Sequence, residues 1–231
     1  MISENVESLR RRIARACDRA GRDPADVTLV AVTKTFSVDA VRAALNAGIR
    51  DVGENYVQEL LKKRGELHDD TVSWHFIGHL QSNKIRLIVR WISMIHAVDS
   101  AGLGREIDRR AAQAGRVIDC LIEVNTTGEK SKFGVHPGQV MGLVRELGDL
   151  ENVRLAGLMT IGPFLADPEG SRPMFRRLRE LRDEIAALRQ LNAPMRHLSM
   201  GMTGDFEVGI EEGATMIRIG TAIFGRRTTQ G

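Results

Sequence analysis

The 231-residue sequence contains no apolar run that approaches the roughly 18 residues needed to span a membrane. Its first segment, MISENVESLRRRIARACDRA, is polar and lacks the apolar core of a secretory signal peptide. We therefore expect a soluble, cytoplasmic protein without a membrane anchor.

Cysteine is scarce, and no metal motif takes its place. The two cysteines, Cys17 and Cys120, form no CxxC pair and lie in apolar settings, as expected for reduced core residues of a cytosolic protein. His75 and His79 have zinc-like spacing for a helix, but in the strand expected around His75 four residues span roughly 13 Å. We expect no metal site, and for His79 a role facing a ligand and a purely structural role both remain open.

Charge of one sign does not accumulate anywhere in the chain. The 33 basic and 30 acidic residues are mixed along the sequence and leave a formal net charge of +3, so no basic block indicates a nucleic-acid partner. No Pro/Ser-rich linker divides the chain, and 42% hydrophobic residues suffice for one large core. We expect a single domain over residues 1–231.

What the sequence does contain is an alternation of short β-rich segments with helical patterns. The first segment has Val6, Leu9, Ile13 and Cys17 at helical spacing and stops at Gly21. Expected strands begin near residues 27, 50, 73, 94, 117, 153, 197 and 215. Helical patterns lie at 38–48, 103–115, 140–148 and 174–188. This α/β order favours a (β/α)8 barrel of the TIM type with an extra N-terminal helix, with a doubly wound open sheet as the alternative.

Lys34 ends the first expected strand. Period-two alternation places Val30, Val32 and Lys34 on one face, and the carboxyl end of a barrel strand is the catalytic rim. A partly desolvated lysine near another cation can form a Schiff base with an aldehyde. The position alone equally fits a lysine that extends into solvent.

Arg218 lies on the inward face of the last expected strand. Ile217 and Ile219 point toward the covering helices, whereas Met216, Arg218 and Gly220 point the other way. A buried guanidinium is costly unless something accepts its hydrogen bonds. A pyridine nitrogen would serve as the acceptor, and so would a carboxylate in a structural ion pair.

The segments after the last two strands are rich in small residues and predict a phosphate site. HLSMGMTGDFEVGIEEG reads as a loop leading into a short helix, with Thr203 or Asp205 as N-cap, and IGTAIFG closes the eighth strand. Barrels commonly bind phosphate at this corner through free backbone N–H groups. Ser199, Gly201, Gly220 and Thr221 would supply small side chains, hydroxyls and close backbone approach, although ordinary turn chemistry would also explain the glycines.

Five segments in order carry a resemblance that extends from about residue 27 to residue 225. They are AVTKTFSVDAVRAALNAGIRDVGENYVQELLKK, WHFIGHLQSNK, EVNTTGEKSKFGV, GLMTIGP and LSMGMTGDFEVGIEEGATMIRIGTAIFG. Together they resemble the pyridoxal phosphate homeostasis protein family, whose members look like the barrel domain of alanine racemase standing alone. The resemblance implies a fold-type III site for pyridoxal 5′-phosphate (PLP).

The resemblance also implies which residues form this site. It makes Lys34 the aldimine lysine, places Asn55 near the cofactor ring, and brings Arg218 to the pyridine nitrogen. It also implies that Ser199, Met200, Gly220 and Thr221 form the phosphate cup. Lys132 matches a recurrent lysine of the family, to which we assign no role.

The expected function is to hold PLP on Lys34 in intracellular vitamin B6 balance, without catalytic turnover. An arginine opposite the pyridine nitrogen weakens the ring as an electron sink, although alanine racemase shares this feature. We also expect no second domain to close over the site after Gly225, which suits hand-over of PLP to PLP-dependent apoenzymes by a monomer. A weak amino-acid racemase or lyase and a Schiff-base aldolase or phosphosugar isomerase are the alternatives.

Overall fold

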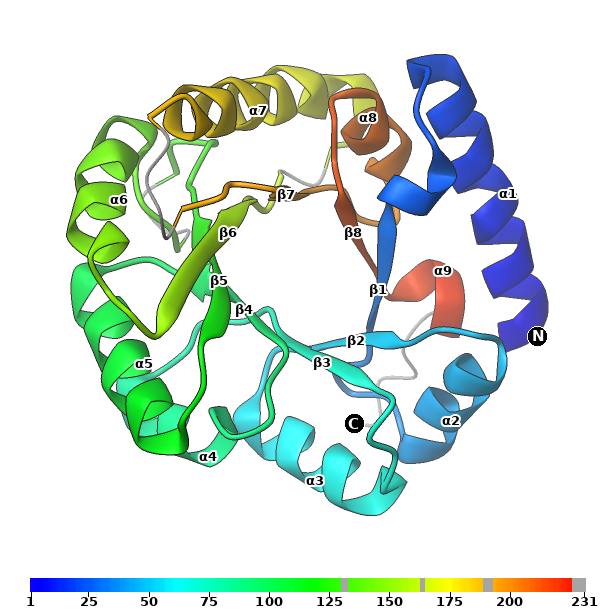
Figure 1. Cartoon of the computed structure of the whole chain (residues 1–231). Coiled ribbons are helices and arrows are strands. Elements are labelled where there is room, and N and C mark those ends of the chain that lie inside the picture. Colours follow the sequence, from blue (N-terminus) through cyan, green and yellow to red (C-terminus); the bar gives the residue numbers. More distant parts are fainter. Residues whose placement is uncertain (130–132, 163–164, 189–192, 226–231) are drawn as a thin grey trace.

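The computed structural model describes residues 1–129, 133–162, 165–188 and 193–225. Within these ranges, eight parallel strands form a closed barrel in chain order, and the last strand pairs with the first. Helices surround the strands, as Figure 1 shows. The expected barrel is confirmed, and the doubly wound open sheet is excluded because the sheet has no free edge.

The elements alternate as the sequence predicts. The strands are β1 (Thr28–Val32), β2 (Asp51–Glu54), β3 (Ser73–Phe76), β4 (Met94–Val98), β5 (Ile118–Glu123), β6 (Val153–Met159), β7 (His197–Ser199) and β8 (Met216–Ile219). The helices are α1 (Ile2–Ala20), α2 (Val38–Asn46), α3 (Val57–Leu67), α4 (Ile85–Ile88), α5 (Ala101–Ala114), α6 (Val140–Gly148), α7 (Arg172–Ala186), α8 (Phe206–Glu211) and α9 (Thr221–Phe224). None of these described helices is both long enough and apolar enough to cross a bilayer.

The extra N-terminal helix α1 is part of the outer ring. Its buried positions include Val6, Leu9, Ile13 and Cys17, the stripe expected from their spacing. Gly21 ends the helix in a left-handed conformation with φ of 62°, which glycine adopts at little cost. α1 packs against α2, α8 and α9 beside the seam between β8 and β1 (Figure 1).

Two apolar cores lie on opposite sides of the barrel wall. The larger core fills the space between strands and helices and includes Ile217 and Ile219. The smaller core lies inside the barrel and consists of Met94, Ala97, Leu121, Ala156, Met159 and Met216. Met216 is therefore inward and its neighbour Ile217 outward, as the alternation in β8 predicts. The same alternation turns Arg218 inward.

Helix α3 is not apparent from apolar periodicity. Its buried face combines Val57, Leu60 and Leu67 with a charged residue, Lys63, whose residue exposure is 4%. A buried lysine interrupts the apolar stripe on which pattern reading depends.

Two glycines offer a matched test of strand packing. A Cβ on Gly157 in β6 would lie 1.9 Å from the main-chain oxygen of His197 in β7, whereas a Cβ on Gly142 in α6 would meet nothing within 4 Å. We predict that Gly157→Ala lowers the free energy of unfolding by about 3 kcal/mol because the strands must separate. Gly142→Ala should raise it by up to about 1 kcal/mol. Urea denaturation measures both changes, and equal effects of the two substitutions would contradict the described packing of β6 on β7.

Candidate functional site

Lys34 lies just beyond the end of β1 and lines a cavity of about 510 Å³. The same cavity is lined by Arg218, Gly220 and Thr221 from the end of β8. The loop that leads into α8 contributes the residues from Met202 to Asp205. The volume is in the range of small-molecule and cofactor sites. The structure thus brings together four of the seven residues singled out in the sequence.

Arg218 is a buried cation whose fixed partners are neutral groups. Its Nη1 donates to the main-chain oxygen of Ser199 at 2.7 Å and to the Ser199 hydroxyl at 2.6 Å, and its Nη2 donates to the main-chain oxygen of Thr160 at 2.8 Å. Burial lowers the pKa of Arg218 to about 10, while the carboxylates of Glu123 and Asp205 act in the opposite direction. The guanidinium therefore remains charged at neutral pH.

The sequence also allowed a structural role for Arg218, in which the inward guanidinium pairs with a carboxylate. The observed hydrogen bonds do not follow this arrangement. Among the described residues, no acidic side chain forms a salt bridge with Arg218. The three described hydrogen bonds use three of the five N–H donors of a guanidinium. The remaining donors can meet an acceptor in the cavity.

A chain of hydrogen bonds extends from Arg218 through the barrel interior. The Ser199 hydroxyl lies 3.0 Å from His96 Nδ1, His96 Nε2 lies 2.9 Å from His75 Nδ1, and His75 Nε2 lies 3.0 Å from the Asp51 carboxylate. The Asp51 carboxylate can only accept, so a neutral His75 donates to it from Nε2 and accepts at Nδ1. His96 then donates from Nε2 and accepts at Nδ1 from the Ser199 hydroxyl. The geometry assigns both histidines the neutral Nε2–H tautomer. Burial lowers the pKa of His96 well below its usual value, in agreement with this assignment.

This chain of hydrogen bonds was not predicted from the sequence, although a signal for it was present. His96 lies two residues after Met94 in β4, so both side chains are on the same face of the strand, and Met94 belongs to the inner core. An inward histidine in a barrel needs a polar partner, and His75 on the neighbouring strand provides one. Among the described residues, no group of three or more His, Cys, Asp or Glu side chains is arranged to hold a metal ion.

The phosphate corner is only partly as expected. Asp205 stands at the N-cap position of α8, but its carboxylate accepts from the Met202 N–H at 2.7 Å and from the Ser171 hydroxyl at 3.1 Å. The Ser199 hydroxyl is engaged by Arg218 and His96. Met200 is fully buried, and its N–H donates to the main-chain oxygen of Met216. Gly220 and Thr221 are the predicted phosphate residues that line the cavity.

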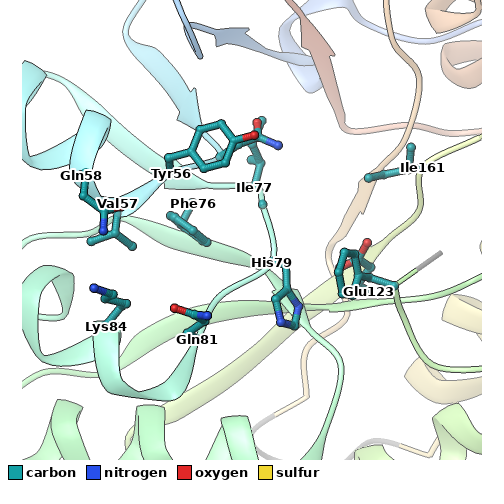
Figure 2. Close-up of a pocket in the computed structure, with 13 residues that line it drawn as sticks. Tyr56, Val57, Gln58, Phe76, Ile77, His79, Gln81, Lys84, Glu123 and Ile161 are labelled. Carbon is teal, nitrogen blue, oxygen red and sulfur yellow. The ribbon is translucent and has the colours of Figure 1, made fainter. Parts of the chain in front are cut away.

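Asn55 lines a second cavity on the same rim. This cavity of about 450 Å³ lies among the ends of β2, β3, β5 and β6, and Figure 2 shows Tyr56, Gln58 and Lys84 on one side of it and Glu123 and Ile161 on the other. The Asn55 side-chain oxygen is buried without a hydrogen-bond partner in the described part of the chain.

His79, another residue of the second cavity, stacks on Phe133 with ring centroids 4.2 Å apart. Its Nδ1 lies 3.6 Å from the carboxylate of Asp99. Lys132 lies outside the described residues.

Glu123 connects the second cavity electrostatically to Arg218. It is 5% exposed, and its burial, together with the nearby Asp99 carboxylate, raises its pKa to about 7, against the opposing effect of Arg218. Glu123 was not among the residues predicted to form the site. Two signals for it were its position at the carboxyl end of β5 and its place at the start of the segment EVNTTGEKSKFGV.

Comparison with known proteins gives a consistent assignment. A model of the alanine racemase N-terminal domain matches residues 5–228. The pyridoxal phosphate homeostasis protein of Aquifex aeolicus (strain VF5) is 47% identical over 224 residues, which cover 97% of both chains. The protein of the same name from Pseudomonas aeruginosa is 43% identical, with 98% of this chain and 96% of that protein covered. The structure of PipY from Synechococcus elongatus PCC7942 with PLP bound superposes with a TM-score of 0.85 at 34% identity, covering 97% of this chain and 100% of PipY.

The raised pKa of Glu123 predicts a pH dependence of stability. Between its unfolded pKa of about 4.3 and its folded pKa of about 7, the folded state binds a proton that the unfolded state has lost, so the contribution of Glu123 to stability falls as the pH rises. Glu123→Gln cannot titrate. From about pH 5 to about pH 8, its unfolding free energy should therefore increase relative to wild type by up to about 3 kcal/mol.

Urea denaturation at several pH values measures this difference. The exposed Glu151→Gln variant is the matched control and should follow the wild-type profile. A constant difference between Glu123→Gln and wild type would show that Glu123 is ionised at every pH tested.

Proposed function

The chain belongs to the pyridoxal phosphate homeostasis protein family, and from this premise we propose that it binds PLP covalently through Lys34. One observation carries the proposal: Lys34 and Arg218, from opposite ends of the sequence, line the same cavity. A pyridoxal site combines a lysine amine that reacts with the aldehyde and an aspartate or arginine that meets the ring nitrogen, and Lys34 and Arg218 supply these two groups.

When bound, PLP supplies an aldehyde that condenses with a primary amine and releases water. The role of Lys34 is to present its amine at the rim of the cavity. The side chain is half-buried rather than extended into solvent, which supports this role over that of an ordinary strand-end lysine.

Arg218 is proposed to bind the pyridine nitrogen through one of its remaining N–H donors. A guanidinium cannot be deprotonated near neutral pH, so it donates to an unprotonated ring nitrogen and does not protonate it. Ser199 fixes the orientation of Arg218 with two hydrogen bonds. The chain through His96, His75 and Asp51 in turn fixes the Ser199 hydroxyl.

The phosphate group is proposed to lie against Gly220 and Thr221. Gly220 has no side chain to cover the main chain, and a Cβ there would approach the Val32 oxygen at 3.3 Å. This close approach favours a glycine, and the absence of a side chain leaves the main chain open to an anion. Ser199 and Met200 are proposed to support this seat, since they lead from β7 into the loop braced by Asp205.

Asn55 is proposed to approach the edge of the ring. Its unpartnered buried side-chain oxygen is a group that a ligand would satisfy. Glu123 lies close enough to Arg218 for each charge to shift the pKa of the other, so the two cavities share one electrostatic environment.

We propose binding and release of the cofactor without turnover, as a monomeric, single-domain cytoplasmic protein that passes PLP to apoenzymes in vitamin B6 balance. The name of the relatives supports a role in homeostasis. The cation opposite the ring nitrogen also withdraws less electron density than a protonated nitrogen would. A weak amino-acid racemase is the second candidate, and it predicts exchange of the α-proton of amino acids in heavy water.

Substitution of Lys34 and Lys84 tests which cavity receives the cofactor. Lys34 lines the first cavity and Lys84 the second. We predict that incubation with PLP, reduction with borohydride and peptide mass mapping find a phosphopyridoxyl group on Lys34. Lys34→Ala should lower the labelling at least about tenfold without unfolding the protein, because no other lysine among the described residues lines this cavity. Lys84→Ala should label as wild type. Labelling that is lost with Lys84→Ala and retained with Lys34→Ala would overturn the proposal.

A further inference from the structure

Lys34 is carried on a tight turn whose geometry is costly. The N–H of Phe36 donates to the main-chain oxygen of Thr33 at 3.0 Å, which closes the turn around Lys34. Thr35 has a φ of 67°, in the left-handed region that a β-branched residue rarely adopts. Such a conformation persists only where the surroundings hold it.

On the preceding side of Lys34, the turn is held by β2 and α3. The Thr33 hydroxyl donates to the Glu54 carboxylate at 2.6 Å. The Thr33 main-chain oxygen accepts from the Lys63 ammonium at 2.6 Å. Glu54 is fully buried at the end of β2, so this side of the turn is attached to the barrel wall.

On the following side, the turn is bonded to α3. The N–H of the left-handed Thr35 donates to the Glu59 carboxylate at 2.8 Å. Burial would raise the pKa of Glu59, but the hydrogen bond from Thr35 and the ammonium groups of Lys63 and Lys34 outweigh it, and the pKa lies below its usual value. Glu59 therefore meets the turn as a carboxylate.

Lys63 links the two sides. Its ammonium donates to Glu54 at 2.5 Å, to Glu59 at 3.0 Å and to the Thr33 main-chain oxygen. These three acceptors use all three N–H donors of an ammonium group. Lys63, Glu54, Glu59 and the turn residue Thr33 therefore form one hydrogen-bond network around Lys34.

Fold stability does not by itself require such a network. Burying an ion pair costs desolvation energy, and apolar residues of similar volume can replace such pairs with little loss. The side chains of Lys63 and Glu54 are 5% and 0% exposed, yet every polar contact of Lys63 is made to the turn or to a residue that holds it. The network is thus placed to fix a backbone conformation.

We propose that Glu59 and Lys63 are positioning residues that hold the main chain on both sides of Lys34 and so direct its amine into the cavity. The role in cofactor uptake rests on the proposed function. The positioning of Lys34 itself does not, because the contacts belong to the protein without any ligand. Loss of the Thr35 contact should release the left-handed conformation and let the Lys34 side chain leave the cavity wall.

Two substitutions at Glu59 separate hydrogen bonding from charge. Glu59→Gln and Glu59→Ala remove the same charge, but only the glutamine retains a side-chain oxygen that can accept from the Thr35 N–H. The side chain is 31% exposed, so neither variant should unfold the protein. We expect Glu59→Ala to slow the reaction of PLP with Lys34 at least about tenfold relative to Glu59→Gln, since an unrestrained amine loses the advantage of orientation. Equal rates for the two variants would overturn the proposal.

A second reagent makes the test independent of the cofactor. Trace acetylation of the ligand-free protein, followed by peptide mass mapping, reports the reactivity of Lys34 against the exposed Lys62 as internal reference. We expect the Lys34 to Lys62 ratio to change in Glu59→Ala and Lys63→Met and to stay near wild type in Glu59→Gln. If PLP labels no lysine but this ratio still changes, the proposed function fails and the positioning role stands.

Leu67→Ala controls for general loosening of α3. Leu67 is buried at the end of the same helix and makes no polar contact with the turn. It should lower the melting temperature without changing the Lys34 to Lys62 ratio. The proposal would be contradicted if this ratio followed the melting temperature in all variants, Leu67→Ala included. Glu59 and Lys63 would then have only a structural role.

Discussion

The buried cation of Arg218 is the constraint on which the site depends. A guanidinium in the barrel interior must have its donors satisfied, and the protein meets this need with neutral acceptors on β7 and at the end of β6. The Ser199 hydroxyl can accept from Arg218 only if its own hydrogen goes elsewhere, which accounts for His96, His75 and Asp51 beyond it. Because the fixed partners of Arg218 are uncharged, its charge remains available to attract an acceptor or an anion at the rim.

Lys34 is held in a different way, from the side of α3. The network of Glu54, Glu59 and Lys63 fixes the turn on both sides of Lys34, as the chain through Ser199 fixes Arg218. Two independent sets of polar contacts therefore direct two groups toward one cavity. A closed barrel makes this arrangement possible, since β1 and β8 are hydrogen-bonded neighbours although they lie at opposite ends of the chain. Such preorganisation is what a site needs to bind a small molecule without rearranging.

The sequence predicted the barrel because strand and helix segments alternate along the chain, and it predicted the inward direction of Arg218 because side chains alternate between the two faces of a strand. It did not predict α3, whose buried face carries Lys63, nor the left-handed Thr35, because both depend on contacts between elements that are distant in the chain. The engagement of the Ser199 hydroxyl by Arg218 and His96 could not be predicted for the same reason. Periodicity describes one element at a time, whereas a site is formed by side chains from several elements.

A crystal structure of the protein grown with PLP tests the central claim most directly. The account predicts density continuous with the Lys34 side chain, a ring nitrogen within hydrogen-bond distance of the Arg218 guanidinium, and a phosphate group against Gly220 and Thr221, with Arg218 still bonded to Ser199. Density for the cofactor in the second cavity, near Lys84 and Glu123, would contradict it, as would a ring nitrogen that faces away from Arg218.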